Sequence, residues 1–133
     1  MNTPRLTLHL ADNRRDFAPG ELLRGQYRFD VLNRSDIRAV EVSVLWHTEG
    51  KGDEDLQVHY FRRLSADDGD YINPFRPGLF RTKLPLSPLS YEGVIVKIHW
   101  CARVRLFLPH NREIVAEQEF RVGELPRARA VLP

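Results

Sequence analysis

The sequence predicts an all-β sandwich of about seven or eight antiparallel strands. Along most of the chain apolar residues recur at every second position, whereas the three- or four-residue spacing of a helix is hard to find. Nine prolines and eight glycines in 133 residues predict many turns, which favours short strands. The length fits one domain. We expect the sandwich to span residues 1–125 and a short tail to span residues 126–133.

The predicted strands follow one another with turn residues between them. Each begins where the alternation of apolar and polar residues starts, near Leu6, Leu23, Val40, Leu56, Phe80, Val94 and Ile114. In the third of these segments, the three valines and Trp46 face one way. The side chains expected on its other face are Glu41, Ser43, Leu45 and His47.

The longest alternating segment runs from Val94 to Leu108 and is expected to be the central strand. Lysine and arginine gather on one of its faces, whereas a helix would scatter them around its circumference. We expect the apolar face to lie in the core, with Val96, Ile98, Trp100 and Val104 among its residues. The opposite face is a candidate interaction face, formed by Lys97, His99, Cys101, Arg103 and Arg105.

Ion pairing offers an explanation of the arginines on this face that needs no ligand. A Pro-His-Asn turn predicts that residues 114–122 return as the second strand of a hairpin. In that hairpin Arg103 lies close to Glu117, and Arg105 lies diagonal to Glu113 and Glu117. Such cross-strand pairs contribute roughly 0.2 to 1 kcal/mol each to stability.

Two motifs carry a resemblance to a known family. The first is a Pro-Gly-Glu turn with a glycine four residues later, formed by Pro19, Gly20, Glu21 and Gly25. The second opens directly into the long strand and consists of Pro88, Ser90, Tyr91, Glu92 and Gly93, with Trp100 further along. Their order and spacing resemble the N-terminal domain of arrestin-like proteins, in the arrestin and Vps26 superfamily, in a single-lobe form. The resemblance implies an immunoglobulin-like, arrestin-type sandwich that binds proteins.

The motif residues also have structural roles that need no partner. Gly20 and Gly93 stand where turns often require a positive φ. The ring of Tyr91 is expected to be buried, and Glu92 is expected to cap or pair at the mouth of the long strand. The chain departs from eukaryotic arrestins because its first strand lacks their paired lysines and it contains no PPxY motif. The resemblance therefore does not extend to receptor binding.

Charge and cysteine content narrow the classes of function. The formal net charge is only +2, so it does not demand a nucleic-acid partner, and most of the 20 basic residues are arginines. Cys101 is the one cysteine, which excludes an internal disulfide and fits a reducing compartment. We find no signal-peptide core and no apolar run long enough to span a membrane. These features predict a soluble cytoplasmic domain.

One strand face could carry chemistry. His99 and Cys101 lie on the same side of the long strand, as would a nucleophile with its base or half of a zinc site completed by residues such as His47. Lys97 and Arg103 would lower the pKa of the thiol but would repel a metal cation. Surface packing is the simpler interpretation, and we predict no catalytic residue, metal or cofactor.

The acidic loops offer a second alternative. Asp53–Asp55 and Asp67–Asp70 are candidate calcium or small-ligand loops, although a solvated turn explains them equally well. The main prediction is a non-enzymatic interaction or scaffold module that binds a protein partner. A sheet edge or a concave face would make the contact, and an edge could instead pair with a second copy of the chain.

Overall fold

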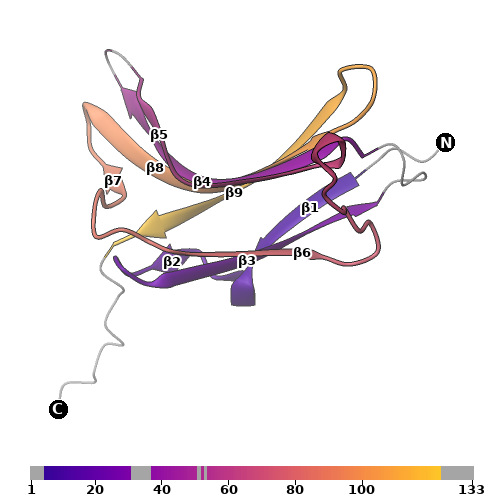
Figure 1. Cartoon of the computed structure of the whole chain (residues 1–133). Helices are drawn as coiled ribbons and strands as arrows, with labels where there is room; N and C mark the ends of the chain where they lie inside the picture. The colour runs from indigo at the N-terminus through magenta and orange to yellow at the C-terminus, as the bar shows by residue number, and fades with distance from the viewer. Residues whose placement is uncertain (1–4, 31–36, 51, 53, 124–133) are drawn as a thin grey trace.

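A computed structural model describes residues 5–30, 37–50, 52 and 54–123, and in it the chain forms a two-layer β-sandwich (Figure 1). The first five strands are β1 (Arg5–Leu10), β2 (Asp16–Phe17), β3 (Leu22–Asp30), β4 (Ala39–Gly50) and β5 (Leu56–Ser65). The remaining strands are β6 (Gly78–Lys83), β7 (Tyr91–Glu92), β8 (Val96–Phe107) and β9 (Glu113–Val122). Two 3-10 turns, η1 (Ala11–Asn13) and η3 (Ala66–Asp68), complete the described elements. The all-β sandwich predicted from the sequence is confirmed, whereas the predicted tail lies outside the described residues.

The two layers differ in size. The smaller sheet has the order β1-β3-β6, and the larger has the order β2-β9-β8-β4-β5, with β7 attached to β8. The larger sheet curves away from the smaller one at its ends, so that its outer face is concave (Figure 1). One pairing departs from the predicted antiparallel arrangement, because β2 runs parallel to the end of β9.

The core lies between the sheets and centres on Trp100, whose side chain is fully buried. Its indole Nε1 donates a hydrogen bond to the carbonyl of Pro88 at 2.9 Å, so the polar edge of the ring is satisfied. Phe120 of β9 packs against the same indole, with ring centroids 6.0 Å apart. The central strand of the larger sheet is thereby tied both to its neighbour and to the loop that precedes it.

Packing inside the smaller sheet follows the predicted alternation. Every second residue of β3 from Leu23 to Phe29 is buried. Gly25 belongs to this inward row, and the ring of Phe80 on β6 lies over it, so that a side chain here would overlap the ring. The glycine of the first motif is therefore a packing requirement of the core.

The long strand is shorter and less buried at its start than the sequence predicted. β8 begins at Val96 instead of Val94, and both Val94 and Ile95 are exposed. Val96 is 39% exposed and Ile98 is half-buried, so the expected core face begins only near Trp100. At this end the larger sheet curves away from the smaller one (Figure 1).

Three residues on the outer face of the larger sheet are more buried than alternation predicted. Ser43, Leu45 and Cys101 are 8%, 1% and 4% exposed, although simple alternation directs them away from the sandwich core. Ser43 is the cross-strand partner of Arg103, and a long side chain on the same face can cover a short neighbour with its aliphatic stem. The outer face therefore has a small buried layer of its own.

Candidate functional site

The predicted interaction face lies on the concave outer face of the larger sheet. We call this surface the concave face and define it by the outward residues of β4, β8 and β9, whose charged members include Glu41, Glu49, Lys97, His99, Arg103, Arg105, Glu113, Glu117 and Glu119. The five residues predicted from β8 do share this face. The structure sets them between rows of glutamates from β4 and β9, which the sequence foresaw only in part.

The two arginines of this face are held by glutamates. Arg103 Nε lies 3.4 Å from Glu117 Oε1, in an ion pair without hydrogen-bond geometry. Arg105 makes two hydrogen bonds to Glu113, at 3.1 and 2.8 Å, and lies 3.6 Å from Glu41. The predicted contacts of Arg103 with Glu117 and of Arg105 with Glu113 are therefore present. Arg105 pairs with Glu41 and not with Glu117, because β4 lies on its other side.

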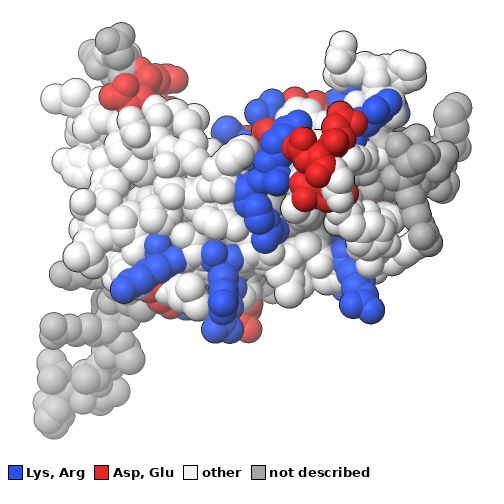
Figure 2. Space-filling view, viewed as in Figure 1, with Lys and Arg blue, Asp and Glu red and all other residues white. Residues whose placement is uncertain are grey.

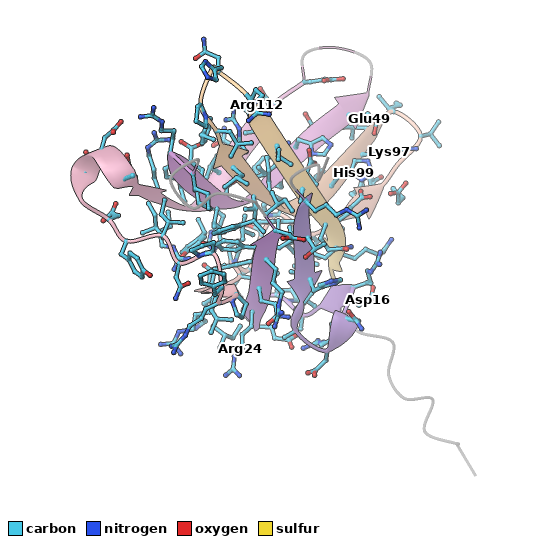
Figure 3. The ribbon with its side chains drawn as sticks, turned by 90° about the vertical axis from the view of Figure 1, so that its right-hand side faces the viewer. Asp16, Arg24, Glu49, Lys97, His99 and Arg112 are labelled. Carbon is cyan, nitrogen blue, oxygen red and sulfur yellow. The ribbon has the colours of Figure 1, made fainter. Side chains whose placement is uncertain are left out.

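His99 is enclosed by carboxylates. Its Nδ1 lies 2.8 Å from Glu119 and its Nε2 lies 3.0 Å from Glu49, and its ring stacks on His47 with centroids 5.2 Å apart. Figure 3 shows His99 beside Glu49 and Lys97 on this side of the sandwich. Glu92 lies 3.8 Å from Lys97, as expected for a residue that pairs at the mouth of the strand.

Cys101 is a buried thiol. Burial, followed by the nearby charge of Glu117, raises the thiol pKa from 9.0 to about 11, although Arg103 acts in the opposite direction. Arg103 lowers this pKa, as expected, but desolvation outweighs it and the net shift is upward. A thiol with such a pKa is a poor nucleophile at neutral pH. Within the described residues, no group of three or more His, Cys, Asp or Glu side chains could hold a metal ion.

The first arrestin-like motif forms a closed turn. Gly20 adopts a positive φ of 79°, as predicted. The carboxylate of Glu21 accepts a hydrogen bond from the backbone N–H of Ala18 at 2.9 Å and pairs with Arg14, which lowers the pKa of Glu21. The backbone of Glu21 also accepts a hydrogen bond from Leu84 at 2.9 Å. These contacts tie the start of β3 to the end of β6.

The second motif joins the loop before β8 to the end of β9. Ser90 donates its backbone N–H to the carbonyl of Val122 at 2.7 Å, and its hydroxyl accepts from the N–H of Val122 at 2.8 Å. Tyr91 is 51% exposed, so the prediction of a buried ring is wrong. Gly93 does not have the positive φ predicted for it. It is small because the ring of Tyr91 and the carbonyl of Val96 approach it closely.

The acidic loops act as turns in the described part of the chain. The backbone N–H of Asp55 donates to Thr48, and Asp70 Oδ2 accepts from the backbone N–H of Ser65, both at 2.9 Å. Gly69 closes η3 in a left-handed conformation. These contacts use the loops as connections between strands. Asp53, the first residue of the other candidate loop, lies outside the described residues.

An apolar sheet edge is a further candidate site, and the sequence pattern did not identify it. β5 pairs with β4 and with no other described strand, so it ends the larger sheet. Its outward side chains Leu56, Val58 and Phe61 are 51%, 52% and 55% exposed. The alternation of Leu56 and Val58 predicted the strand, but alternation does not tell an edge from a central strand. We call these three residues and their strand the β5 edge.

The other edges of the sandwich are better covered. Arg62 Nη2 donates to the carbonyl of Leu79 and His59 Nε2 to that of Lys83, at 2.9 and 2.7 Å, so β5 side chains occupy outward carbonyls of β6. The end of β9 is paired with β2, and β9 presents glutamates on its outer face. β1 has only six residues and exposes polar side chains. Charge, shortness and coverage are common protections of sheet edges.

Comparisons with known proteins support the fold and leave the function open. No family model matches the chain. The sporulation control protein Spo0M from Bacillus subtilis has a similar structure, with a TM-score of 0.66 and 15% identity over 94% of this chain and 51% of that one. This likeness supports the arrestin-like sandwich, and at this identity it shows the fold alone. A β-glucosidase from Listeria innocua matches with a TM-score of only 0.40 and 14% identity, over 91% of this chain and 16% of that one.

One curated protein matches in sequence. The tRNA pseudouridine synthase A of Rhodospirillum centenum is 29% identical over 114 residues, which cover 78% of this chain and 46% of that protein. The chain thus spans about half the length of this protein and of Spo0M. The match is too weak and too partial to decide whether the chain is an enzyme. Among the described residues, no helix has the length and apolar character needed to cross a bilayer.

Proposed function

We propose that this domain is a non-enzymatic cytoplasmic interaction module that binds a protein partner by adding a strand of that partner to the β5 edge. The observation that carries the proposal is the exposure of Leu56, Val58 and Phe61 on a strand with only one described neighbour. Unpaired backbone groups of an edge strand supply hydrogen bonds to an incoming strand, and alternate side chains supply selectivity.

The contrast between the edges supports this choice. A long apolar edge left open is a liability, because it invites pairing with any extended chain. Here two carbonyls of β6 are occupied and β9 carries glutamates, whereas the outward row of β5 is apolar and exposed at Leu56, Val58 and Phe61, before it reaches Arg63. We infer that the incoming strand has apolar side chains at alternate positions, directed toward the concave face.

The cations of the concave face are less suited to an anionic ligand. Arg103 and Arg105 are already paired with glutamates, and so are Lys97 and His99. An anionic ligand would have to displace those carboxylates, and its own contacts would have to offset the free energy of the lost ion pairs. We therefore propose that the concave face lies next to the incoming strand and is not itself the main binding surface. Leu45 and Cys101 are buried on this face.

The test places a photo-crosslinking amino acid at Phe61 in the full-length chain. The matched control places it at Val115, which is 45% exposed on the same face of β9. After irradiation in native cytosol, we expect a discrete crosslinked protein at position 61 and none at position 115. Adding Val58→Lys should reduce the product at least about tenfold, because it puts a charge into the apolar row.

The outcomes separate the proposal from its alternatives. A product of twice the chain mass, formed by the purified protein alone, would identify the edge as a homodimer contact instead. Equal amounts of crosslinked product at positions 61 and 115 would contradict binding at the β5 edge. So would a product at position 61 whose amount is unchanged by Val58→Lys.

A further inference from the structure

The outer face of the smaller sheet collects basic side chains that form no ion pair within the described part of the chain. We call this surface the basic face, and its cations are Arg5, Arg24, Arg28, Arg81 and Lys83. All five are exposed, and none of them makes an ion pair with a residue in the described ranges. Figure 2 shows basic side chains projecting from the lower layer, and Figure 3 shows Arg24 on the side away from Lys97 and His99.

Two of these arginines are opposed to each other. Arg24 of β3 and Arg81 of β6 are direct cross-strand partners. Like charges at directly opposed positions destabilise a sheet, whereas opposite charges stabilise it. The adjacent cross-strand positions of β3 and β6 supply no carboxylate to this pair, since Leu22 lies opposite Lys83 and Gln26 lies opposite Leu79. A cost to folding that the fold does not compensate is expected at a binding surface.

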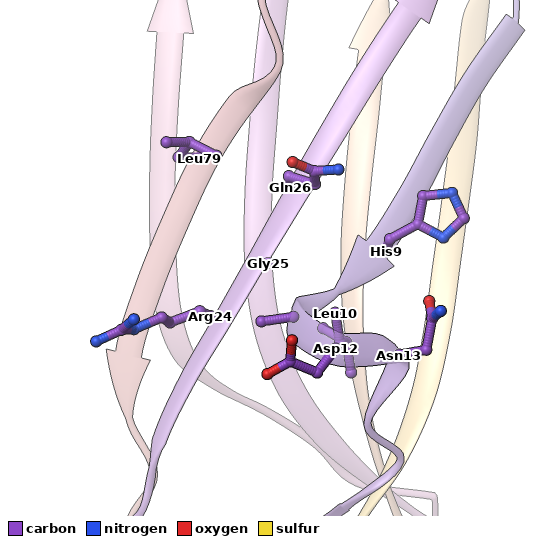
Figure 4. A pocket seen from close by; sticks show the side chains of 9 residues that line it. His9, Leu10, Asp12, Asn13, Arg24, Gly25, Gln26 and Leu79 are labelled. Atoms are coloured by element: carbon purple, nitrogen blue, oxygen red, sulfur yellow. The ribbon is translucent and has the colours of Figure 1, made fainter.

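The acidic residues near the basic face leave its cations unpaired. Asp30 is the cross-strand partner of Arg5, and Asp12 lines the same shallow depression as Arg24 (Figure 4). Neither carboxylate forms an ion pair with a basic-face cation. At the other end, Arg76 lines a second depression together with Arg5 and Arg28 and adds to the basic charge.

The arrangement of the cations favours a planar anionic surface over a single extended chain. They come from all three strands, and Lys83 and Arg5 stand opposite Leu22 and Asp30, eight residues apart on β3. Eight residue steps span about 27 Å along a strand. An acidic peptide follows one line and would contact only part of this pattern. A bilayer offers anionic groups over the whole area.

The other outward side chains of the basic face also favour a membrane surface as the partner. Leu79 is 65% exposed and Leu22 is 39% exposed, among the cations. Basic residues interspersed with exposed apolar ones suit the interface of an anionic bilayer. Among the outward residues of β1, β3 and β6, His9 is the one side chain with a ring, so these strands offer no row of stacking residues of the kind that holds single-stranded nucleic acids.

We propose that the basic face docks the domain onto the surface of a membrane that contains anionic phospholipids. The contact is peripheral, with the arginines at the headgroup phosphates and Leu79 directed toward the interface. It uses the face opposite the concave face and leaves the β5 edge free. The inference therefore goes beyond the proposed function and does not depend on it.

The test measures co-sedimentation of the full-length protein with two kinds of vesicle. One kind contains phosphatidylcholine alone, and the other contains phosphatidylcholine with phosphatidylglycerol. We expect binding to the anionic vesicles only, falling as salt is raised. The double variant Arg24→Glu/Arg81→Glu should bind at least about 25-fold more weakly, since each basic residue near such a surface contributes about fivefold.

A matched variant controls for net charge and folding. Arg38→Glu/Arg112→Glu makes the same change in charge at two exposed residues outside the basic face, and it should bind like the natural protein. Thermal unfolding confirms that both variants fold. Equal loss in both variants, equal binding to neutral vesicles, or no vesicle binding would overturn the proposal. Tight binding to polyuridylate or to an acidic peptide without vesicle binding would assign the face to another partner and would also overturn it.

Discussion

The two outer faces of the sandwich use the same kinds of charged residue in opposite ways. On the concave face, the cations of β8 lie between glutamates, with separations such as 2.8 Å from Arg105 to Glu113 and 3.4 Å from Arg103 to Glu117. On the basic face, Arg24 stands opposite Arg81, and no described carboxylate pairs with either. Both faces belong to one small domain with a formal net charge of only +2.

The difference lies in the neighbouring strands. β8 has β4 on one side and β9 on the other, and both supply glutamates to the outer face. β3 has β1 and β6 beside it, and these supply threonine, histidine, leucine and further basic residues. An arginine row is therefore structural where its neighbours are acidic, and it remains available to a ligand where they are not.

The largest expected effect concerns the thiol beneath the ion pairs of the concave face. Folding raises the pKa of Cys101 from 9.0 to about 11, so the folded state holds the proton that the unfolded chain loses more readily. This contribution to stability is fully present below pH 9 and is lost as pH rises toward 11. The free energy of unfolding should fall by about 2–3 kcal/mol over that range.

Urea denaturation at a series of alkaline pH values measures this loss. Tyr27, whose pKa burial also raises, contributes in the same direction. The Cys101→Ala variant isolates the thiol, because only the part of the slope that disappears in it belongs to Cys101. An unchanged slope in this variant would show that the thiol is not desolvated.

A smaller effect is expected for the ion pairs themselves. Arg105→Gln removes the two hydrogen bonds to Glu113 and the contact with Glu41. Because Arg105 is 41% exposed at its side chain, we expect a loss of only about 0.5–1 kcal/mol in the free energy of unfolding. Arg112→Gln, in the turn between β8 and β9, is the control and should change little. Equal losses of unfolding free energy in the two variants would show that the ion pairs of Arg105 do not stabilise the fold.

The smallest expected change in stability has the opposite sign and tests the difference between the two faces most directly. Arg81→Glu on the basic face replaces a repulsive cross-strand pair with an attractive one to Arg24. We expect the unfolding free energy to rise by about 0.2–1 kcal/mol while binding to anionic vesicles weakens. Thermal melts and vesicle sedimentation on the same preparation measure both quantities. A destabilised Arg81→Glu protein would show that Arg81 serves the fold.

Much of the fold followed from alternation because side-chain period and burial are directly linked in strands. β3 shows the predicted inward row from Leu23 to Phe29, and the hairpin of β8 and β9 brings Arg103 to Glu117. Alternation failed at the start of β8, where Val94 and Ile95 are exposed. Apolar sequence marks residues that are able to form a core, but a second layer must be present to cover them.

The candidate sites were less predictable because each depends on strand order. The candidate residues on β8 were found together, yet the sequence did not show that Glu41 and Glu49 of β4 would also reach them. Its cationic neighbours were expected to lower the pKa of Cys101, and burial makes the net shift upward. Calcium binding by the acidic loops, binding of a protein partner and the lack of enzymatic activity remain predictions.

The sequence by itself determined the all-β class, most of the strands and the two turn motifs. It did so because alternation, proline and glycine act over a few residues. Tertiary structure alone decided which strand became an open edge, which arginines met glutamates and which thiol was buried. These outcomes depend on neighbours that are distant in sequence, as in the opposition of Arg24 to Arg81 across β3 and β6. Local sequence patterns carry no information about such neighbours, because the order of the strands in each sheet decides which residues meet.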